Sequence, residues 1–415
     1  RHGMNAIIGV GVDPAKRAAA TSTGNEGMVV GRHVSDYPPG AQFRPEATEM
    51  NSTDQRPSPR PAVDKVVIER AGSYDRLEMV TVAAFEPGDD EVVVTVHAIG
   101  VNYADCMVRM GLYQSAKDLV GWPITPGFEV AGVVCAHGKD VTDLPVGTRV
   151  IAMTLFDGYA SEVCVRRPYI FAMPDGLSFS QAAGFTAVFL TAYYALHELA
   201  HPRPGATMLV HSAAGGVGTC LVQLGKRAGC QVVGVVGAAH KVGLARSMGA
   251  DHVIDKSTED LWAEARRLVP GGYDVVLDAN GVATLKQSYR HLRRTGKLVV
   301  YGFHTMMPRR GGVPNWPKLI TSYLRTPRFN PLEMTTRSRS VLAFNLSYLY
   351  ERLDILDEAM TALLGWLESG QIQAPPVTEY AFARVADAHR DIESAQTTGK
   401  LVLIPDRSVQ DADQP

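Results

Sequence analysis

Cysteine is scarce: the chain of 415 residues contains five, and no two of them form a CxxC pair. An odd number of cysteines cannot close into a complete set of disulfides, and a four-cysteine zinc site needs paired ligands. The cysteine count therefore argues against both a disulfide-stapled secreted scaffold and a zinc knuckle. A reducing, cytoplasmic environment is the expectation that follows.

An excess of charge of one sign is also lacking. The 41 Lys and Arg residues nearly balance the 43 Asp and Glu residues, the net charge is -2, and no basic run stands out. Nothing in this balance draws the chain towards nucleic acid or anionic lipid. We therefore expect no nucleic-acid partner.

Signals for export or membrane insertion are missing as well. The N-terminus has no basic-then-apolar pattern. The stretch between Asp175 and Glu198 contains no charged residue, which raises the question of a transmembrane helix, but Gln181 and several Ser, Thr and Gly residues interrupt it. We expect a helix buried between domains and no transmembrane segment, with peripheral membrane contact left open.

Changes in composition divide the chain into segments. Residues 1–62 are rich in Pro, Gly, Ser and Thr without a sustained period, so we expect disorder there, and residues 406–415 resemble a polar tail. Residues 63–184 contain short apolar strands such as EVVVTVHAIGV between Pro and Gly turns, which predicts a mostly β lobe. Residues 347–405, with a helix at 353–369 and the strand KLVLIP, are expected to return to that lobe.

Residues 185–346 alternate between apolar strands and segments of helix length. The strands TMLVH, QVVGVVG, HVI, DVVLD and KLVVYG are separated by helices expected at 216–229, 239–249, 257–268 and 281–293. Continuous apolar strands joined by helices are typical of a parallel sheet covered on both faces. The predicted fold class is α/β: a doubly wound parallel sheet of the Rossmann type beside a mostly β domain.

A glycine turn follows the first of these strands. After TMLVH come Ser212, Ala213, Ala214, Gly215, Gly216, Val217 and Gly218, and then a helical stretch. The spacing matches GxGxxG with alanine in the first position, where Gly215 permits a close approach of the backbone to a pyrophosphate and Gly218 allows the helix to pack on the strand. A helix N-terminus presents free N–H groups to phosphates. The turn therefore predicts a dinucleotide site, and the Walker pattern for nucleoside triphosphates is absent.

The end of the second strand indicates which nicotinamide coenzyme is used. NAD sites usually place Asp or Glu about 20 residues after the glycines to bind the ribose hydroxyls. Here the chain continues with Gly237 and Ala238, and no acidic residue precedes Asp251. Lys241, Arg246 and Lys256 could instead pair with a 2'-phosphate, although Arg246 equally suits a solvated helix face. NADPH is the expected cofactor.

A second motif points elsewhere. His197, Glu198 and His201 spell HExxH, which on a helix would place two imidazoles on one face for zinc. Pro202 follows His201 directly and biases it away from helical geometry. No acidic residue lies between Glu198 and Asp251 to serve as a nearby third ligand, so we expect this motif to end a helix without binding metal.

The motifs along roughly residues 63–405 together resemble the medium-chain dehydrogenase/reductase superfamily, and within it the zinc-independent quinone oxidoreductase branch. The stretches with this resemblance are GVNYADCMVRMGLY, PITPGFEVAGVV, VGTRVIAM, GYASEVCV, LTAYYAL, HSAAGGVG, GADHVID, GKLVVYG and GKLVLIP. HSAAGGVGTCLVQL and AFNLSYL are most similar to vesicle amine transport protein homologues. The resemblance implies a GroES-like fold for the mostly β lobe. It departs from the family at Lys256, where a tyrosine is common.

The resemblance also argues against a catalytic metal. Zinc alcohol dehydrogenases of the superfamily have a cysteine ligand where this chain has Asn102, and a histidine where it has Phe128. Neither residue supplies a thiolate or an imidazole, so no metal is expected. Hydrogen bonds would then polarise the carbonyl, which favours conjugate reduction of a quinone or an α,β-unsaturated carbonyl.

The family's motifs also indicate individual site residues. On the substrate side they are Asn102, Tyr103 and Tyr113, whose polar groups could donate to a substrate oxygen, with Asp105 as a brace for the loop. On the coenzyme side the matching positions are Thr191, Asn280, Tyr301, Phe303, Phe344, Asn345 and Lys400. Packing alone would also account for the tyrosines, and a surface role for Lys400.

Two alternative functions stay open. An enoyl-thioester reductase of fatty-acid or polyketide type shares the fold, and Arg309, Arg310, Lys318, Arg325 and Arg328 could bind the phosphopantetheine arm or simply be solvated. A weakly catalytic NADPH-binding protein associated with vesicles or lipid is the other. The resemblance further implies a homodimer, with RSVLAFNL as the edge strand that pairs.

Overall fold

The computed structural model describes residues 60–406, so the disorder predicted for most of residues 1–62 and the polar tail fall outside the described residues. The first element in the described residues is an antiparallel pair of β1 (Val63–Val67) and β2 (Glu78–Val82). Short 3-10 turns occur along the chain at Tyr74–Arg76, Arg167–Tyr169, Ala239–Lys241, His304–Met306, Leu346–Leu349 and Phe382–Arg384.

A seven-stranded sheet forms the mostly β lobe. Its strands are β3 (Glu91–Val101), β4 (Glu129–His137), β5 (Arg149–Met153), β6 (Glu162–Arg166), β7 (Ile170–Ala172), β14 (Val377–Ala381) and β15 (Lys400–Ile404). The order is β14-β15-β3-β4-β5-β7, and β6 also pairs with β3. The C-terminal strands thus complete a sheet begun 300 residues earlier, since Leu401 pairs with Val101.

Four helices accompany this lobe. They are α2 (Tyr103–Arg109), α3 (Gln114–Leu119), α4 (Phe179–Ala183) and α13 (Val385–Ser394). Helix α13 packs on α2, so it lies beside the helix that follows β3. This is the GroES-like domain that the sequence predicted.

The second sheet is parallel and has six strands. They are β8 (Thr207–His211), β9 (Gln231–Val236), β10 (His252–Asp255), β11 (Tyr273–Asp278), β12 (Leu292–Val300) and β13 (Ser340–Ala343). The order β10-β9-β8-β11-β12-β13 is that of a Rossmann domain, and it confirms the predicted doubly wound fold. Strand β13, which forms part of the stretch RSVLAFNL predicted as an edge strand, lies at one edge of this sheet.

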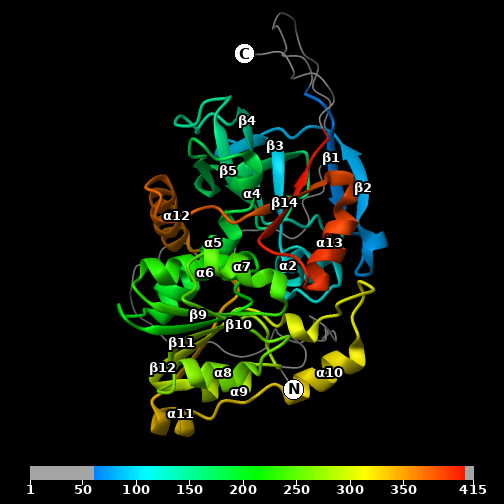
Figure 1. The fold of residues 1–415 in the computed structure, drawn as a ribbon. Coiled ribbons are helices and arrows are strands. Elements are labelled where there is room, and N and C mark those ends of the chain that lie inside the picture. Colours follow the sequence, from blue (N-terminus) through cyan, green and yellow to red (C-terminus); the bar gives the residue numbers. More distant parts are fainter. Residues whose placement is uncertain (1–59, 407–415) are drawn as a thin grey trace, which may run out of the picture. The chain divides into compact units, whose positions relative to one another are not determined.

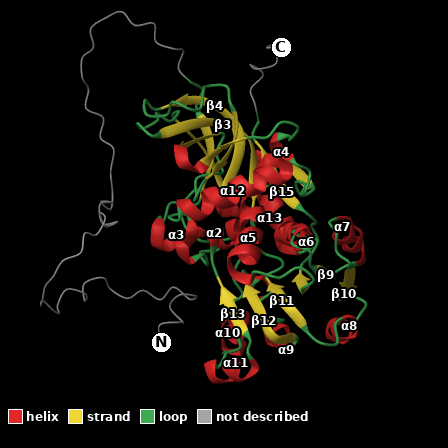
Figure 2. Ribbon diagram, turned by 90° about the vertical axis from the view of Figure 1, so that its left-hand side faces the viewer, coloured by secondary structure: helices red, strands yellow, loops and turns green. Residues whose placement is uncertain are grey.

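Helices cover both faces of the parallel sheet (Figure 2). On one side lie α5 (Thr186–Tyr193) and α6 (Gly216–Arg227), and on the other α8 (Leu261–Leu268) and α9 (Leu285–Arg290). The remaining helices are α7 (Val242–Ser247), α10 (Trp316–Arg325), α11 (Pro331–Arg337) and α12 (Leu353–Glu368). Helix α12 packs against α5.

Two of the predicted helices begin later than expected. Ser257 donates to the carboxylate of Asp255 through its backbone and its hydroxyl, so a side-chain turn precedes α8, which starts only after its N-cap Asp260. In the segment predicted as helix 281–293, Gly281 has a φ of 83° and β12 already begins at Leu292. Local side-chain hydrogen bonds compete with the helix at such positions.

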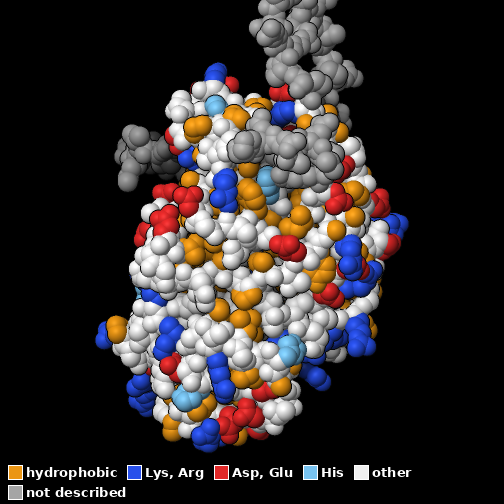
Figure 3. Space-filling model, turned by 45° about the horizontal axis from the view of Figure 1, so that its top comes forward, with side chains coloured by type: hydrophobic (Ala, Val, Ile, Leu, Met, Phe, Trp, Pro, Cys, Tyr) orange, Lys and Arg blue, Asp and Glu red, His pale blue; other side chains and the backbone are white. Residues whose placement is uncertain are grey.

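The uncharged stretch before the parallel sheet is divided among three short elements. Helix α4 is followed by α5 and then by a π-helical turn, Tyr194–Ala200. No helix within residues 60–406 is long and apolar enough to cross a bilayer. On the face shown in Figure 3, acidic and basic side chains are interspersed.

Candidate functional site

The glycine turn connects β8 to α6 with little free space. Ser212 adopts a left-handed φ of 55°, and Gly215 is the N-cap of α6. A methyl group on Gly218 would lie 2.1 Å from the carbonyl oxygen of Ser212, so only glycine allows the helix this approach. On Gly215, by contrast, a methyl group would meet nothing nearer than 3.4 Å. The turn therefore leaves its outer side at Gly215 open to a ligand.

The C-terminal segment lies against this turn. Gly399 forms a parallel β-bridge with Gly215, and its N–H donates to the carbonyl of Ala214 over 2.9 Å. This contact places Lys400 beside the start of α6, where its Cδ lies 3.7 Å from the position of a methyl group on Gly216. The coenzyme turn and the last strand of the other sheet thus form one site.

Lys400 belongs to a group of three polar side chains, in which Lys400 and Glu129 are buried and Asn102 is half-buried. Its Nζ lies 2.6 Å from Oε1 of Glu129 and donates to Oδ1 of Asn102 over 2.5 Å. The Asn102 amide donates to the same Glu129 oxygen over 3.0 Å. Glu129 also accepts from the backbone N–H of Ala187 at the start of α5. One N–H bond of Asn102 is thereby used within the protein, and the predicted substrate contact would depend on the other.

Sequence reasoning missed Glu129. It follows Phe128 in PGFEVAG, and its side chain is fully buried at the start of β4. A lone acidic residue at the head of an apolar strand was the available signal. Such a carboxylate must find charged or polar partners in the interior, and here it finds Lys400.

Asp105 braces the loop that contains Asn102, as predicted. Its carboxylate accepts from the backbone N–H groups of Asn102 and Gly127, over 2.7 and 2.9 Å, and from the Tyr159 hydroxyl over 3.1 Å. Burial raises the pKa of Asp105 to about 7, opposed by the hydrogen bonds it accepts and by the charge of Lys400. All three donors belong to the protein itself and hold the Asp105 carboxylate in the interior, so we assign this residue a structural role.

The two candidate tyrosines lie in different environments. The Tyr113 hydroxyl lies 2.8 Å from Oδ1 of Asn345 and 2.9 Å from Oγ of Ser347, and its ring packs edge-on against Phe128. Burial raises the pKa of Tyr113, so the hydroxyl keeps its proton at neutral pH. Tyr113 therefore meets Asn345, which was assigned to the coenzyme side.

Tyr103 begins α2 and packs among apolar side chains near the 301–307 segment. Its ring lies 6.1 Å from that of His304 in an edge-to-face arrangement. Burial raises its pKa as well, and its hydroxyl makes no hydrogen bond within the described part of the chain. The structure does not bring Tyr103 and Tyr113 into one cluster.

A network at the carboxyl end of β11 positions Asn280. Asp278 accepts from the backbone N–H groups of Asn280 and Gly281 through one oxygen, and from the Ser288 hydroxyl through the other. The amide oxygen of Asn280 lies 3.4 Å from Oγ of Ser212 in the glycine turn. Its amide nitrogen is buried without a partner among the described residues. That orphaned donor lies beside the glycine turn, where the strand order reverses.

Lys241 and Lys256, both predicted to bind the 2'-phosphate, differ in their side-chain contacts. Lys241 donates to the backbone carbonyls of Ala395 and Thr397 over 2.7 and 2.9 Å, so it fastens the turn before β15. The backbone N–H of Lys256 donates to the carbonyl of Val236, but its side chain makes no hydrogen bond within residues 60–406, and its Cε lies 3.4 Å from the position of a methyl group on Gly237. Burial and the nearby charge of Arg309 lower the pKa of Lys256. Lys256 directly follows β10, and its side chain thus lies beside the end of β9.

The remaining candidates lie around these groups. Thr191 donates to the carbonyl of Ala187 in its own helix, and the Phe344 ring packs on Tyr194 at 4.9 Å. Tyr301 directly follows β12, and Phe303 lies where a methyl group on Gly281 would meet its ring at 2.8 Å. Ala213 is buried, Val217 is half-buried in the first turn of α6, and Ala238 is the extended residue before the 3-10 turn Ala239–Lys241.

The HExxH motif does not form a helical pair of imidazoles. His201 has left-handed backbone angles of 44° and 59°, which confirms that it leaves α geometry. The His197 ring packs between Tyr193 and Trp366, and its Nε2 is buried without a partner in the described part of the structure. Burial, with the nearby charges of Arg227 and His201, lowers the pKa of His197 to about 4.

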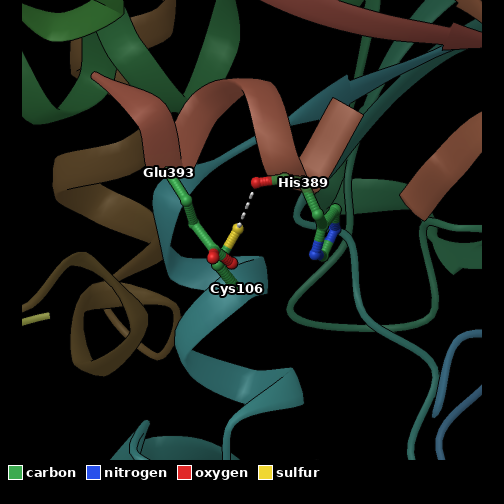
Figure 4. A group of neighbouring side chains, drawn as sticks. All are labelled: Cys106, His389 and Glu393. Carbon is green, nitrogen blue, oxygen red and sulfur yellow. Dashed lines mark hydrogen bonds between the residues drawn. The ribbon is translucent and has the colours of Figure 1, made fainter. Parts of the chain in front are cut away.

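A different trio with metal-ligating side chains lies between α2 and α13 (Figure 4). The ligand atoms of Cys106, His389 and Glu393 lie within 4.8 Å of one another. The buried guanidinium of Arg109, however, lies 2.7 Å from the Glu393 carboxylate and donates to Nδ1 of His389 over 2.8 Å. Because a fixed positive charge uses the lone pairs that a cation would need, we assign this cluster to anchoring α13 on α2.

Comparisons with known proteins agree with this geometry. Two family models match: the alcohol dehydrogenase GroES-like domain over residues 88–204 and the zinc-binding dehydrogenase domain over residues 248–403. The synaptic vesicle membrane protein VAT-1 homolog of Danio rerio is 34% identical over 340 residues, which cover 81% of this chain and 69% of that protein.

Two solved structures have the same fold. The Escherichia coli quinone oxidoreductase complexed with NADPH is 27% identical, with a TM-score of 0.71, over 82% of this chain and all of that one. The enoyl reductase CurK is also 27% identical with a TM-score of 0.71, over 83% of this chain and 99% of that one. The chain therefore belongs to the medium-chain dehydrogenase/reductase superfamily, in its zinc-independent quinone oxidoreductase branch and close to the VAT-1 homologues.

Proposed function

We propose that this protein is an NADPH-dependent, zinc-independent reductase of quinones or α,β-unsaturated carbonyls. The observation that supports this most directly is the contact between Lys400 and Asn102. It joins the glycine turn to the position where the zinc enzymes of the superfamily have a cysteine ligand. A coenzyme site is thus adjacent to an amide and an ammonium group instead of a metal-binding pair.

The residues around the glycine turn fit a phosphorylated dinucleotide. The partnerless amide of Asn280 suits a ribose hydroxyl, because a buried donor without an acceptor is costly. Lys256 beside the end of β9, with Arg309 near it, suits a 2'-phosphate. The N-terminus of α6 suits the pyrophosphate. When bound there, NADPH would supply a hydride for transfer to the substrate.

The protein's own contribution would be positioning and hydrogen bonding. Glu129 and Lys400 fix the orientation of Asn102, so its second amide N–H could donate to the substrate oxygen where negative charge collects. Tyr113 stays protonated and could donate to the same oxygen if its bond to Asn345 is exchanged. Neither role needs a Lewis acid, and the side chains of Asn102 and Phe128 do not suit zinc.

The decisive test is NADPH oxidation across a panel of quinones, enones and enoyl thioesters, repeated with EDTA. We expect turnover of small quinones or enones that EDTA leaves unchanged. Loss of turnover in EDTA would overturn the zinc-independent mechanism. Tyr113→Phe should lower kcat/KM for the acceptor about tenfold, since one hydrogen bond to developing charge is lost.

An enoyl-thioester reductase is the second candidate. The similarity to the enoyl reductase CurK and the basic residue Arg309 beside Lys256 both favour it. A thioester requires cations for its phosphopantetheine arm, whereas a small quinone does not. Faster turnover of crotonyl thioesters than of quinones, with a loss in Arg309→Ala, would support this candidate.

The third candidate is a protein that binds NADPH with little catalysis. It is favoured by the similarity to proteins named for synaptic vesicle membranes. Tight NADPH binding without oxidation by any acceptor in the panel would support it. In each case we infer a cytoplasmic homodimer in which two β13 edges pair, since an open apolar edge is usually covered.

A further inference from the structure

Four buried side chains connect helix α13 to the backbone of Asn102. The guanidinium of Arg109 donates to Nδ1 of His389 over 2.8 Å, and Nε2 of that ring lies 3.1 Å from the Tyr159 hydroxyl. The same hydroxyl lies 3.1 Å from Oδ2 of Asp105, which also accepts from the Asn102 N–H over 2.7 Å. The side chains of Arg109, His389, Tyr159 and Asp105 are all 0% exposed, and we call them the Arg109–Asp105 network.

The hydrogen bonds of this network can run in only one direction. A guanidinium has donors only, so Nδ1 of His389 must accept and has no proton. Burial and the charge of Arg109 lower the pKa of His389, so the ring is neutral and its single proton is on Nε2. Nε2–H then donates to the Tyr159 oxygen, which leaves the phenolic hydrogen for Asp105. The fixed charge of Arg109 therefore determines that Tyr159 donates to Asp105.

Tyr159 makes this cluster more than an anchor for α13. Arg109 already fastens α13 on α2 through its pair with Glu393. Tyr159 lies in neither helix but just before β6, and its hydroxyl extends the cluster to Asp105. The other oxygen of Asp105 accepts from the Gly127 N–H over 2.9 Å. Both carboxylate oxygens thus face a donor, and a proton on either of them would displace one.

We propose that Tyr159 and His389 are positioning residues for Asn102, because they hold the Asp105 carboxylate ionised and the carboxylate holds the Asn102 backbone. The Asn102 side chain is bound to Lys400 beside the glycine turn, so a shift of its backbone would move its amide relative to the coenzyme. That this amide serves a substrate rests on the proposed function, whereas the order of the hydrogen bonds does not.

Asp105 is the member of the network that titrates near neutral pH. Burial raises its pKa to about 7, while the hydrogen bonds that it accepts and the charge of Lys400 lower it. Above about pH 7 the carboxylate holds its donors, and below that it takes up a proton and releases one of them. Burial raises the pKa of Tyr159 and lowers that of His389, so both stay neutral. The titratable groups that face the network from outside are Tyr74, Tyr103, Cys106, Tyr113, Glu393 and Lys400.

The first test needs neither coenzyme nor substrate. In NMR spectra of the full chain with 15N-labelled histidine, the His389 ring should have a proton on Nε2 and none on Nδ1 at about pH 7. After correction for intrinsic rates, the amides of Asn102 and Gly127 should exchange hydrogen more slowly at about pH 8 than at about pH 6. Tyr159→Phe should speed exchange at both amides. A proton on Nδ1 of His389, or exchange that Tyr159→Phe leaves unchanged, would overturn the proposal.

The second test separates positioning from general stability. Tyr159→Phe should lower kcat about tenfold and move the acidic limb of its pH profile upward by about one unit, since Asp105 loses a donor that favours its ionised form. The Kd for NADPH should not change. Tyr273→Phe is the matched control, because the Tyr273 hydroxyl is also buried and donates to the carbonyl of Ala265 over 2.9 Å in the other domain. It should leave the pH profile unchanged.

A second pair of variants keeps the test decisive if Tyr159→Phe does not fold. His389→Gln provides an amide N–H in place of Nε2–H and should keep exchange at Asn102 slow, whereas His389→Leu should speed it. Equal exchange in these two variants would overturn the proposal, as would an unshifted acidic limb in Tyr159→Phe. If the unaltered protein oxidises NADPH with no acceptor, the proposed function fails, and exchange at Asn102 still decides whether the network positions this residue.

Discussion

The Nζ atom of Lys400 donates to Oδ1 of Asn102 over 2.5 Å, although the two residues are 298 positions apart in the chain. The same ammonium lies 2.6 Å from Glu129, and both charged side chains are almost completely buried, at 3% and 0% exposure. The loop after β3, the start of β4 and the start of β15 therefore meet at one charged contact.

Removing one charge of this contact should be costly. Lys400→Met would leave the Glu129 carboxylate buried without its counter-ion, and we expect a loss of about 3 kcal/mol in the free energy of unfolding. The measurement is urea denaturation followed by circular dichroism. Lys139→Met, which breaks an exposed pair with Asp89, should cost less than about 1 kcal/mol. Adding Glu129→Gln to Lys400→Met should recover part of the loss; strictly additive losses would show that the two groups do not interact.

Two glycine-to-alanine substitutions should change the stability of the fold in opposite directions. At Gly218 the new methyl group would lie 2.1 Å from a backbone oxygen that cannot move aside, so Gly218→Ala should destabilise the fold by on the order of 3 kcal/mol and weaken NADPH binding. Gly365 is exposed within α12, and a methyl group added there would meet no atom within 4 Å other than the backbone of its own helix. Gly365→Ala should therefore stabilise by about 0.5–1 kcal/mol. Thermal melts of both variants, with coenzyme titration of the first, check the pair.

His197 should make stability depend on pH in the acidic range. Its pKa is about 4 in the folded protein, against about 6.5 for an unperturbed histidine, so the unfolded chain binds the proton more readily. The stability contributed by the neutral ring is complete above about pH 6.5 and is lost as the pH falls towards 4. In His197→Phe the ring packing stays and this loss disappears. We therefore expect the free energy of unfolding of His197→Phe, relative to that of the unaltered protein, to rise by about 1–2 kcal/mol as the pH falls from 6.5 to 4. This range allows for the partial exposure of His197.

The measurement is the urea midpoint of the unaltered protein and His197→Phe at several pH values. Parallel curves from pH 6.5 to 4 would contradict the prediction. His197→Phe should also be slightly more stable at neutral pH, because it removes a buried ring nitrogen without a hydrogen-bond partner.

Lys256 and Lys241 should differ in coenzyme discrimination. Lys256→Ala removes the cation beside the end of β9 that has no partner in the described chain, and should raise the Kd for NADPH about tenfold while leaving that for NADH unchanged. Lys241→Ala removes bonds to Ala395 and Thr397, so it should weaken both coenzymes alike by loosening the turn before β15. Isothermal titration with each coenzyme gives the ratio of the Kd for NADH to the Kd for NADPH in each variant. An unchanged ratio in Lys256→Ala would mean that another group selects the phosphate.

The fold and the coenzyme turn could be predicted because their signals are local. Apolar runs such as TMLVH and QVVGVVG determine parallel strands, and Gly218 is required by a contact six positions away, with Ser212. The start of α8 was missed because the turn at Asp255 and Ser257 depends on side-chain hydrogen bonds. Such bonds can satisfy the backbone in place of a helix.

The site beyond the turn could be predicted only in part. Motif matches identified Asn102, Tyr113, Asn345 and Lys400 individually, but not that Lys400 contacts Asn102 or that Tyr113 contacts Asn345. These pairs come from different segments of the chain, and periodicity carries no information about them. Glu129 and the pairing of Lys241 with a backbone turn were missed for the same reason.

The pairing of β15 with β3 has a consequence for biosynthesis. Because Leu401 lies opposite Val101, the sheet of the mostly β lobe keeps an open edge until β15 has left the ribosome, about 300 residues after β3. The parallel sheet in between can assemble first, from strands that are all close in sequence. During translation the nascent β3 edge would remain exposed to aggregation and would be a natural place for a chaperone to bind.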